Sequence, residues 1–239
     1  MSRWRRRKDI DQPGRGNPPI NSSTMEVKIT QDTSWKRALN EARRTAGKPA
    51  LDKEPSEKWK RMSIMAEHSP IKLVEYTIMF SDLRQWVGVH ILRHEHLLPY
   101  IHTQREDRRE DIDILLDKIM SILEDDIKND PEFCKRDWLP QGQVNDQDFV
   151  VNVQTLINIS RKRLCSCASK QTREAWELVK KVMEDVDPVV ALFMVKNCIY
   201  RGFCPEMNCC GFYKTAKFKK DVNDYRNLIG RGDNGNGQD

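Results

Sequence analysis

One segment, residues 111–127, repeats apolar side chains at the spacing of an α-helix. The apolar positions form one stripe: Ile112, Leu115, Leu116, Ile119, Ile122, Leu123 and Ile127. Acidic residues occupy the other face, so the stripe needs a surface that buries it. The segment therefore predicts an amphipathic helix from Asp111 to Ile127 and favours a helix-rich fold.

Few other segments have the two-residue period of a strand. Residues 25–30 alternate apolar and polar side chains and predict a first strand, and a helix should follow, capped within 32–34 and ending near Thr45. Residues 71–80 are rich in strand-forming side chains. Helical spacing resumes at 83–98, before Pro99, and recurs at 149–163 and 171–186, whereas 131–148 is predicted to be a loop. The pattern predicts an α+β fold with few strands.

The composition is that of a globular chain with a very polar surface. Of the 239 residues, 38% are hydrophobic and 32% are charged. No apolar run reaches the length of a membrane span. The N-terminus has arginines but no apolar core of a secretory signal after them. We expect a cytoplasmic protein with no membrane segment.

Most of the net charge of +5 lies in the first 22 residues. These hold six arginines and lysines and two aspartates, which leaves a charge of about +1 for the rest. A nearly neutral folded part argues against a general nucleic-acid-binding domain. We interpret residues 1–22 as a basic flexible tail, either a solvated arm or a contact for nucleic acid or a membrane surface.

All five histidines fall between His68 and His102, close to several arginines. Such a concentration of costly polar groups points to an anionic ligand, a metal or a proton. Position 98 is leucine, so the histidine spacing of zinc hydrolases is missing. Thr103 and Arg105 would stand at the start of a helix that begins near Glu106, where hydroxyl, guanidinium and helix end could bind phosphate. The alternative is that Arg105 only pairs with the neighbouring acids.

The remaining candidates lie later in the chain. Arg163 and Arg173 belong to a cluster of cations that suits either an anionic ligand or salt bridges. The seven cysteines lack the C-x-x-C spacing of common metal sites, so we predict no metal site. The alternative is a structural zinc or iron–sulfur site, whose candidate ligands are Cys165, Cys198, Cys204 and Cys209.

Five motifs in order resemble the flavin-dependent thymidylate synthase family (ThyX). That family has Arg-His-Arg, seven residues, then Ser-x-Arg. Here Arg93-His94-Glu95 precedes Thr103-Gln104-Arg105 at the same spacing. The other matching stretches are residues 27–44, His68-Ser69-Pro70, Asn152 with Arg163-Leu164-Cys165 and Arg173, and Cys198 with Cys204-Pro205-Glu206 and Cys210-Gly211.

The resemblance implies the family's α+β fold with a small, mostly antiparallel sheet. It also implies a homotetramer with shared active sites. The catalytic domain would cover residues 25–212, followed by a C-terminal extension, 213–239, with a flexible end. The implied reaction transfers a one-carbon unit from methylenetetrahydrofolate to C5 of dUMP, with FAD as cofactor and NADPH as reductant, to give dTMP.

By matching position, three groups of residues receive roles. The cofactor group is His68, Arg93, His94, Glu95 and Asn152. The substrate group is Thr103, Gln104, Arg105, Arg163 and Arg173. Within it, the catalytic role falls to Thr103, Arg105 and Arg173.

The chain departs from the family at positions that bear on its activity. Glu95 replaces an arginine and reverses its charge, and Thr103 replaces a serine. Two alternatives therefore stand beside the thymidylate synthase. One is an enzyme that forms another 5-substituted deoxyuridylate, and the other is a non-catalytic nucleotide- or metal-binding protein on the same scaffold.

Overall fold

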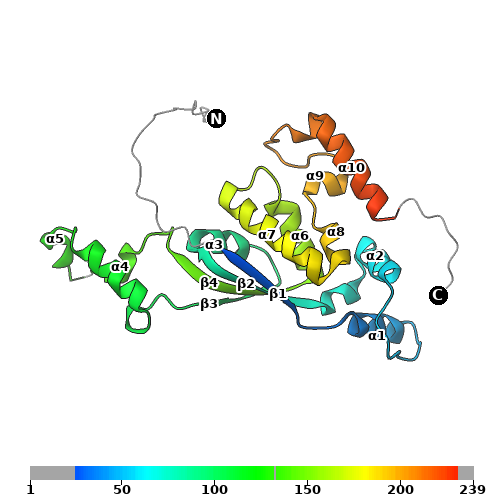
Figure 1. The fold of residues 1–239 in the computed structure, drawn as a ribbon, viewed down its shortest axis with the longest axis horizontal. Helices are drawn as coiled ribbons and strands as arrows, with labels where there is room; N and C mark the ends of the chain where they lie inside the picture. The colour runs from blue at the N-terminus through cyan, green and yellow to red at the C-terminus, as the bar shows by residue number, and fades with distance from the viewer. Residues whose placement is uncertain (1–24, 132, 231–239) are drawn as a thin grey trace.

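A four-stranded antiparallel sheet lies at the centre of the molecule, with strand order β1-β2-β4-β3 (Figure 1). The computed structural model describes residues 25–131 and 133–230. The strands are β1 (Glu26–Gln31), β2 (Glu75–Arg84), β3 (Leu97–Ile101) and β4 (Val144–Asn152). Alternate residues of β2 and β4 are buried, as expected for strands with one face on a core.

The helices are α1 (Trp35–Thr45), α2 (Glu57–Met65), α3 (Gln85–Leu92), α4 (Glu110–Met120), α5 (Asp125–Lys128), α6 (Val153–Arg163), α7 (Lys170–Val186), α8 (Pro188–Phe193), α9 (Asn197–Arg201) and α10 (Ala216–Leu228). Several of them cover the buried face of the sheet, and α1 and α2 lie at one of its ends (Figure 1). Side chains of α3, α6, α7 and α8 join those of the sheet in one hydrophobic core. A second, smaller core joins α9 to α10. Single turns of 3₁₀ helix lie at Ser69–Leu73, Glu106–Arg108, Lys135–Trp138 and Phe212–Lys214.

The structure confirms the α+β class and the small antiparallel sheet. No helix within 25–131 and 133–230 combines the length and apolar character needed to cross a membrane. The tail predicted at residues 1–22 and the chain end beyond 230 lie outside the described residues.

Two strands contradict the expectations from sequence. Residues 97–101 form β3, although the helical spacing at 83–98 and Pro99 predicted a helix followed by a break; α3 ends at Leu92. Strand β4 spans the end of the loop expected at 131–148 and the start of the helix expected from Phe149. Phe149 and Val151 are buried while their neighbours are partly exposed, so this stretch has the period of a strand.

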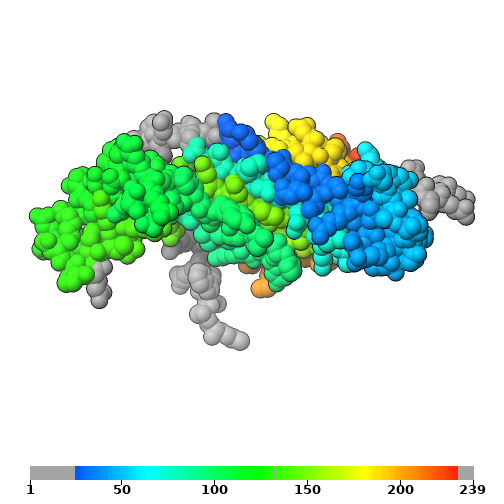
Figure 2. All heavy atoms as spheres, turned by 90° about the horizontal axis from the view of Figure 1, so that it is seen from below, coloured from blue at the N-terminus to red at the C-terminus, as the bar shows by residue number. Residues whose placement is uncertain are grey.

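The long helix predicted from Asp111 to Ile127 is also wrong in its second half. α4 ends at Met120, where the Ser121 hydroxyl donates to the main-chain oxygen of Lys118 at 2.7 Å, and a separate short helix, α5, follows. Both helices lie on an arm that extends from the end of the sheet opposite α1 and α2 (Figures 1 and 2). The apolar stripe is packed only in α4, where Ile112 and Leu116 are buried, whereas Ile122 beyond it is 80% exposed. An apolar stripe without a partner surface does not sustain a long helix.

The buried carboxylate of Asp187 lies between three helices and one strand. Its Oδ2 accepts hydrogen bonds from Trp35 Nε1 of α1 at 2.6 Å and from the Tyr76 hydroxyl of β2 at 2.8 Å. Its Oδ1 accepts from the Val190 amide at 3.2 Å and so caps α8. Lys60 Nζ of α2 lies 3.8 Å away. Burial, and then the charge of Asp187, raise the pKa of Tyr76 above its usual value, so the phenol remains a donor.

We predict that Asp187→Ala lowers the free energy of unfolding by about 3–5 kcal/mol, because it leaves buried donors and a partly buried ammonium without an acceptor. Urea unfolding followed by tryptophan fluorescence measures the loss. Asp185→Asn, an exposed position on the same helix, is the control and should change little. Equal effects of the two substitutions would contradict the role given to Asp187.

Candidate functional site

Arg163, at the end of α6, binds the segment that follows α3. Its Nε donates to His94 Nε2 at 3.0 Å, and its Nη2 donates to the main-chain oxygen of His90. Because Nε2 of His94 accepts this bond, the imidazole is neutral and carries its proton on Nδ1. We call His90, Arg93, His94 and Arg163 the basic cluster.

No described carboxylate forms an ion pair with the two arginines of the basic cluster. Burial, and then the charges of Arg163 and Lys162, lower the pKa of His94 to about 4. Burial and the charge of Arg93 lower the pKa of Arg163. The neighbouring cations Arg161, Lys162 and Arg173 each pair with a glutamate, whereas no ion pair forms at Arg93 or Arg163 among the residues that the structure describes. Such a cluster suits an anionic ligand.

A hollow of about 400 Å³ opens beside the basic cluster. Asn152 caps α6 there by accepting from the Thr155 amide at 2.9 Å, and the Thr155 hydroxyl donates to the main-chain oxygen of Glu95 at 3.3 Å. These two bonds hold the segment after α3 against the start of α6. Cationic, imidazole and amide side chains dominate the lining, which consists of Lys72, Arg93, His94, Glu95, His96, Asn152, Gln154, Thr155 and Asn158.

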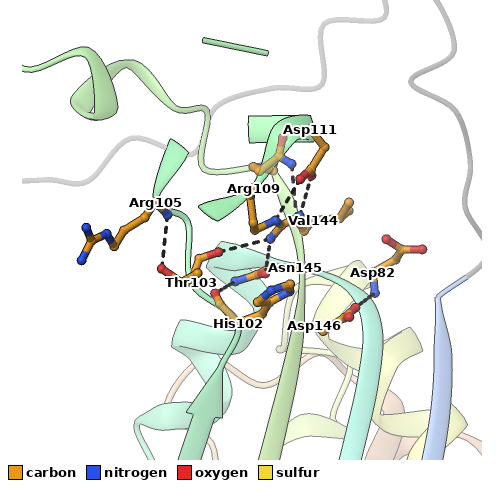
Figure 3. Close-up of polar contacts among 10 residues, drawn as sticks. Asp82, His102, Thr103, Arg105, Arg109, Asp111, Val144, Asn145 and Asp146 are labelled. Carbon is orange, nitrogen blue, oxygen red and sulfur yellow. Dashed lines mark hydrogen bonds and ion pairs between the residues drawn. The ribbon is translucent and has the colours of Figure 1, made fainter. Parts of the chain in front are cut away.

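The second half of the ThyX-like motif lies in the loop after β3. We call residues 102–105 the substrate loop, after the role that the resemblance to the ThyX family implies for it. The Thr103 hydroxyl accepts from the Arg105 amide at 3.3 Å, and the Arg105 guanidinium binds both oxygens of Asp107 at 2.9 and 2.6 Å (Figure 3 shows the loop). The Arg105 side chain is 51% exposed. A carboxylate therefore pairs with the guanidinium predicted to bind phosphate.

The predicted helix start at Glu106 is a single 3₁₀ turn, and α4 begins only at Glu110. Arg105 therefore does not stand at the N-terminus of α4. Phosphate binding by this loop would rest on its side chains rather than on a long helix.

Within one chain, the structure does not bring the two halves of the motif together. Leu97 at the start of β3 pairs with Val151, and Ile101 at its end pairs with Gln147. The strand thus separates the basic cluster from the substrate loop by roughly 14 Å, at about 3.4 Å per residue.

Of the other predicted site residues, Arg173 lies near the basic cluster and His68 does not. Arg173 lies in the first turn of α7, 3.7 Å from Glu177. The preceding residue, Thr172, contacts His90 Nδ1 at 3.1 Å, which places this end of α7 beside the basic cluster. His68 is exposed and does not line the hollow.

The cysteines considered as metal ligands do not form a metal site in the described part of the chain, where no three ligating side chains are grouped to hold an ion. Cys165 and Cys198 are buried, and the thiols of Cys204 and Cys209 share a hydrogen bond.

The sequence did not indicate several residues that the site uses. Thr172 and the hollow residues Lys72, Gln154 and Asn158 have side chains too common to stand out. Asn145 and Arg109, which contact the substrate loop, come from the region predicted to be a loop and from a run of charges. His90 lies one helical turn before His94 and has no place in the family motif.

We predict that the His94 ring titrates near pH 4, well below the usual value of about 6.5. Between these pH values the unfolded chain binds a proton that the folded chain does not, so this contribution to stability is present above pH 6.5 and is lost as the pH falls towards 4. An NMR titration of the ring measures the pKa directly. In unfolding experiments, His94→Gln should flatten the pH dependence across this window. A ring that titrates near 6.5 would contradict the burial and the Arg163 contact.

Comparison with known proteins identifies solved structures that share the fold of this chain. No protein-family model matches the chain, and no curated protein matches it. Two solved structures of the UMP/dUMP methylase PolB from Streptomyces cacaoi are similar to it. The structure bound with 5-Br UMP is 12% identical, with a TM-score of 0.51 over 73% of this chain and 97% of the other. The structure bound with 5-Br dUMP is 13% identical, with a TM-score of 0.52 over 76% and 96%. At this identity the likeness shows a shared α+β architecture.

Proposed function

We propose that the chain is an enzyme that methylates a uridylate, dUMP above all, at C5 of the uracil. The observation that carries the proposal is the basic cluster: two arginines without carboxylate partners, beside a polar hollow. This cluster occurs on a fold shared with structures of a UMP/dUMP methylase. A nucleotide phosphate would supply the missing negative charge.

FAD is the cofactor that the resemblance to the ThyX family implies, and the hollow supports it. Arg93, Lys72 and His94 can bind phosphate oxygens, and the amides of Asn152 and Gln154 can donate to or accept from polar groups of the cofactor. When bound, the flavin supplies the hydride, with NADPH as its reductant and methylenetetrahydrofolate as the one-carbon donor. The chain's own residues would bind and orient the cofactor and the substrate, and would exclude water from the site.

In this proposal the substrate loop binds the nucleotide. The Thr103 hydroxyl, Gln104 and Arg105 would contact the phosphate, and Arg163 and Arg173 would bind phosphate or polarise the uracil. Since β3 separates this loop from the basic cluster, one active site would take its halves from two copies of the chain. A homotetramer with shared sites would satisfy that requirement.

Glu95 favours a second candidate reaction. Its carboxylate lines the hollow where the family has a guanidinium, so it repels phosphate there and can accept hydrogen bonds instead. An enzyme that adds a different one-carbon substituent to deoxyuridylate is the candidate that this change favours.

The first test of the proposal is the visible absorption spectrum of the purified protein. The protein should carry, or take up, FAD with the visible spectrum of an oxidised flavin. With methylenetetrahydrofolate and NADPH it should then release tritium from 5-³H-dUMP. A colourless protein that does not bind added FAD would overturn the flavin assignment. Binding of FAD without tritium release would overturn the reaction.

Arg105→Ala should reduce tritium release at subsaturating dUMP by about 10- to 100-fold, because a charge-assisted phosphate contact is lost. Arg108→Ala, which removes a nearby exposed arginine, is the matched control and should keep nearly full activity. If both variants match the wild type, Arg105 does not bind substrate.

Asp107→Asn should have the opposite effect. It frees the Arg105 guanidinium from its exposed carboxylate partner, an interaction that is weak in water. We expect the KM for dUMP to fall a few-fold at low ionic strength and the difference to shrink as salt is added. An unchanged or raised KM would show that Asp107 does not compete with the nucleotide.

A further inference from the structure

We propose that Arg109 and Asn145 are positioning residues that hold the substrate loop in place through its main chain. The proposal rests on the assignment of nucleotide binding to that loop. Neither residue was assigned a role by the family resemblance, and Figure 3 shows Asn145 between Arg109 and His102 of the loop.

Asn145 uses both ends of its side-chain amide. It lies on β4 and is 2% exposed. Its Nδ2 donates to the main-chain oxygen of His102 at 2.6 Å, and its Oδ1 accepts from Arg109 Nη1 at 2.6 Å. Because a guanidinium can only donate, Arg109 forces Oδ1 towards itself and Nδ2 towards His102. The orientation of the amide is therefore set by the arginine.

Arg109 is itself held from the other side. Its Nε and Nη2 bind the two oxygens of Asp111 at 2.9 and 2.5 Å, and Nη1 also lies 3.5 Å from the main-chain oxygen of Thr103. The planar fork of the guanidinium makes these contacts mutually dependent. Asp111 belongs to the first turn of α4, so the arm and the loop share one hydrogen-bond network.

The two arginine–aspartate pairs in this region differ in exposure. Arg105 and Asp107 are both about half exposed, so Arg105 can exchange its partner for a ligand. The Arg109 side chain is only 13% exposed, and its contacts extend to a buried amide. Arg105 is therefore suited to bind the nucleotide, while Arg109 is suited to keep the loop in place.

The attachment lies where the loop leaves the sheet. The His102 amide donates to the main-chain oxygen of Asp146 at 2.9 Å, so both main-chain groups of His102 are bound to β4 or its side chains. Thr103 and Arg105 follow directly. A loop fixed in advance loses less entropy when it binds the nucleotide, which lowers KM rather than raising kcat.

The test compares Arg109→Met with Arg108→Met, which removes the same charge from an exposed neighbour. Arg109→Met should raise the KM for dUMP about tenfold, the scale on which a displaced binding group costs affinity, with little change in kcat. Arg109→Lys can still donate to Asn145 and should recover part of the loss. Asn145→Asp keeps an acceptor for Arg109 but loses the donor to His102, so it should raise KM as well. Arg108→Met should match the wild type.

Hydrogen–deuterium exchange of the free protein separates positioning from general destabilisation. Residues 102–106 should exchange faster in Arg109→Met and Asn145→Asp, while β2 and α7 keep their protection. Unchanged exchange and unchanged KM in both variants would overturn the proposal, as would exchange that rises equally throughout the chain. If the wild type does not act on dUMP, the proposed function fails, and the exchange at 102–106 still decides whether Arg109 and Asn145 fix the loop.

Discussion

The buried carboxylate of Asp187 is the interaction on which the arrangement of the helices depends. It fixes the C-terminal end of α7 against α1, β2 and α8. At the other end of α7, about 25 Å away for a helix of this length, Thr172 contacts His90 beside the basic cluster. The same helix therefore connects the structural centre of the fold to its candidate ligand site, and a change in the position of α7 would move His90 relative to Arg163.

The two halves of the candidate site handle charge in different ways. In the basic cluster, burial and the charge of Arg93 lower the pKa of Arg163, and no described carboxylate forms an ion pair with it, so an incoming anion has no partner to displace. In the substrate loop, Asp107 already occupies Arg105, and an anion must replace it. In the proposed function, the first arrangement would suit a resident polyanion such as FAD, and the second would suit a nucleotide that is exchanged in every turnover.

The sequence predicts the elements whose patterns are local. The strand β1 and the helices α1 and α7 match their expected positions closely, because their apolar periods are regular and Pro188 stops α7. β3 and β4 could not be predicted, since β3 is short and contains Pro99, and the buried side chains of β4 run directly into those of α6. At the site, the family spacing pointed to Arg93, His94 and Arg105. It could not indicate Asn145, whose role depends on a contact with Arg109 that only the tertiary structure creates.

Pro99 has a consequence for how the sheet can grow. β3 is an edge strand, and the exposed side chains of Leu98 and Tyr100 flank the proline on it. A proline offers no N–H to a neighbouring strand, so a further chain cannot add to this edge with a regular ladder. Pro99 thereby hinders the edge-to-edge strand pairing that leads to aggregation, even though this edge carries apolar side chains. At Pro99, contacts with other molecules rest on side chains, where shape and chemistry can select the partner.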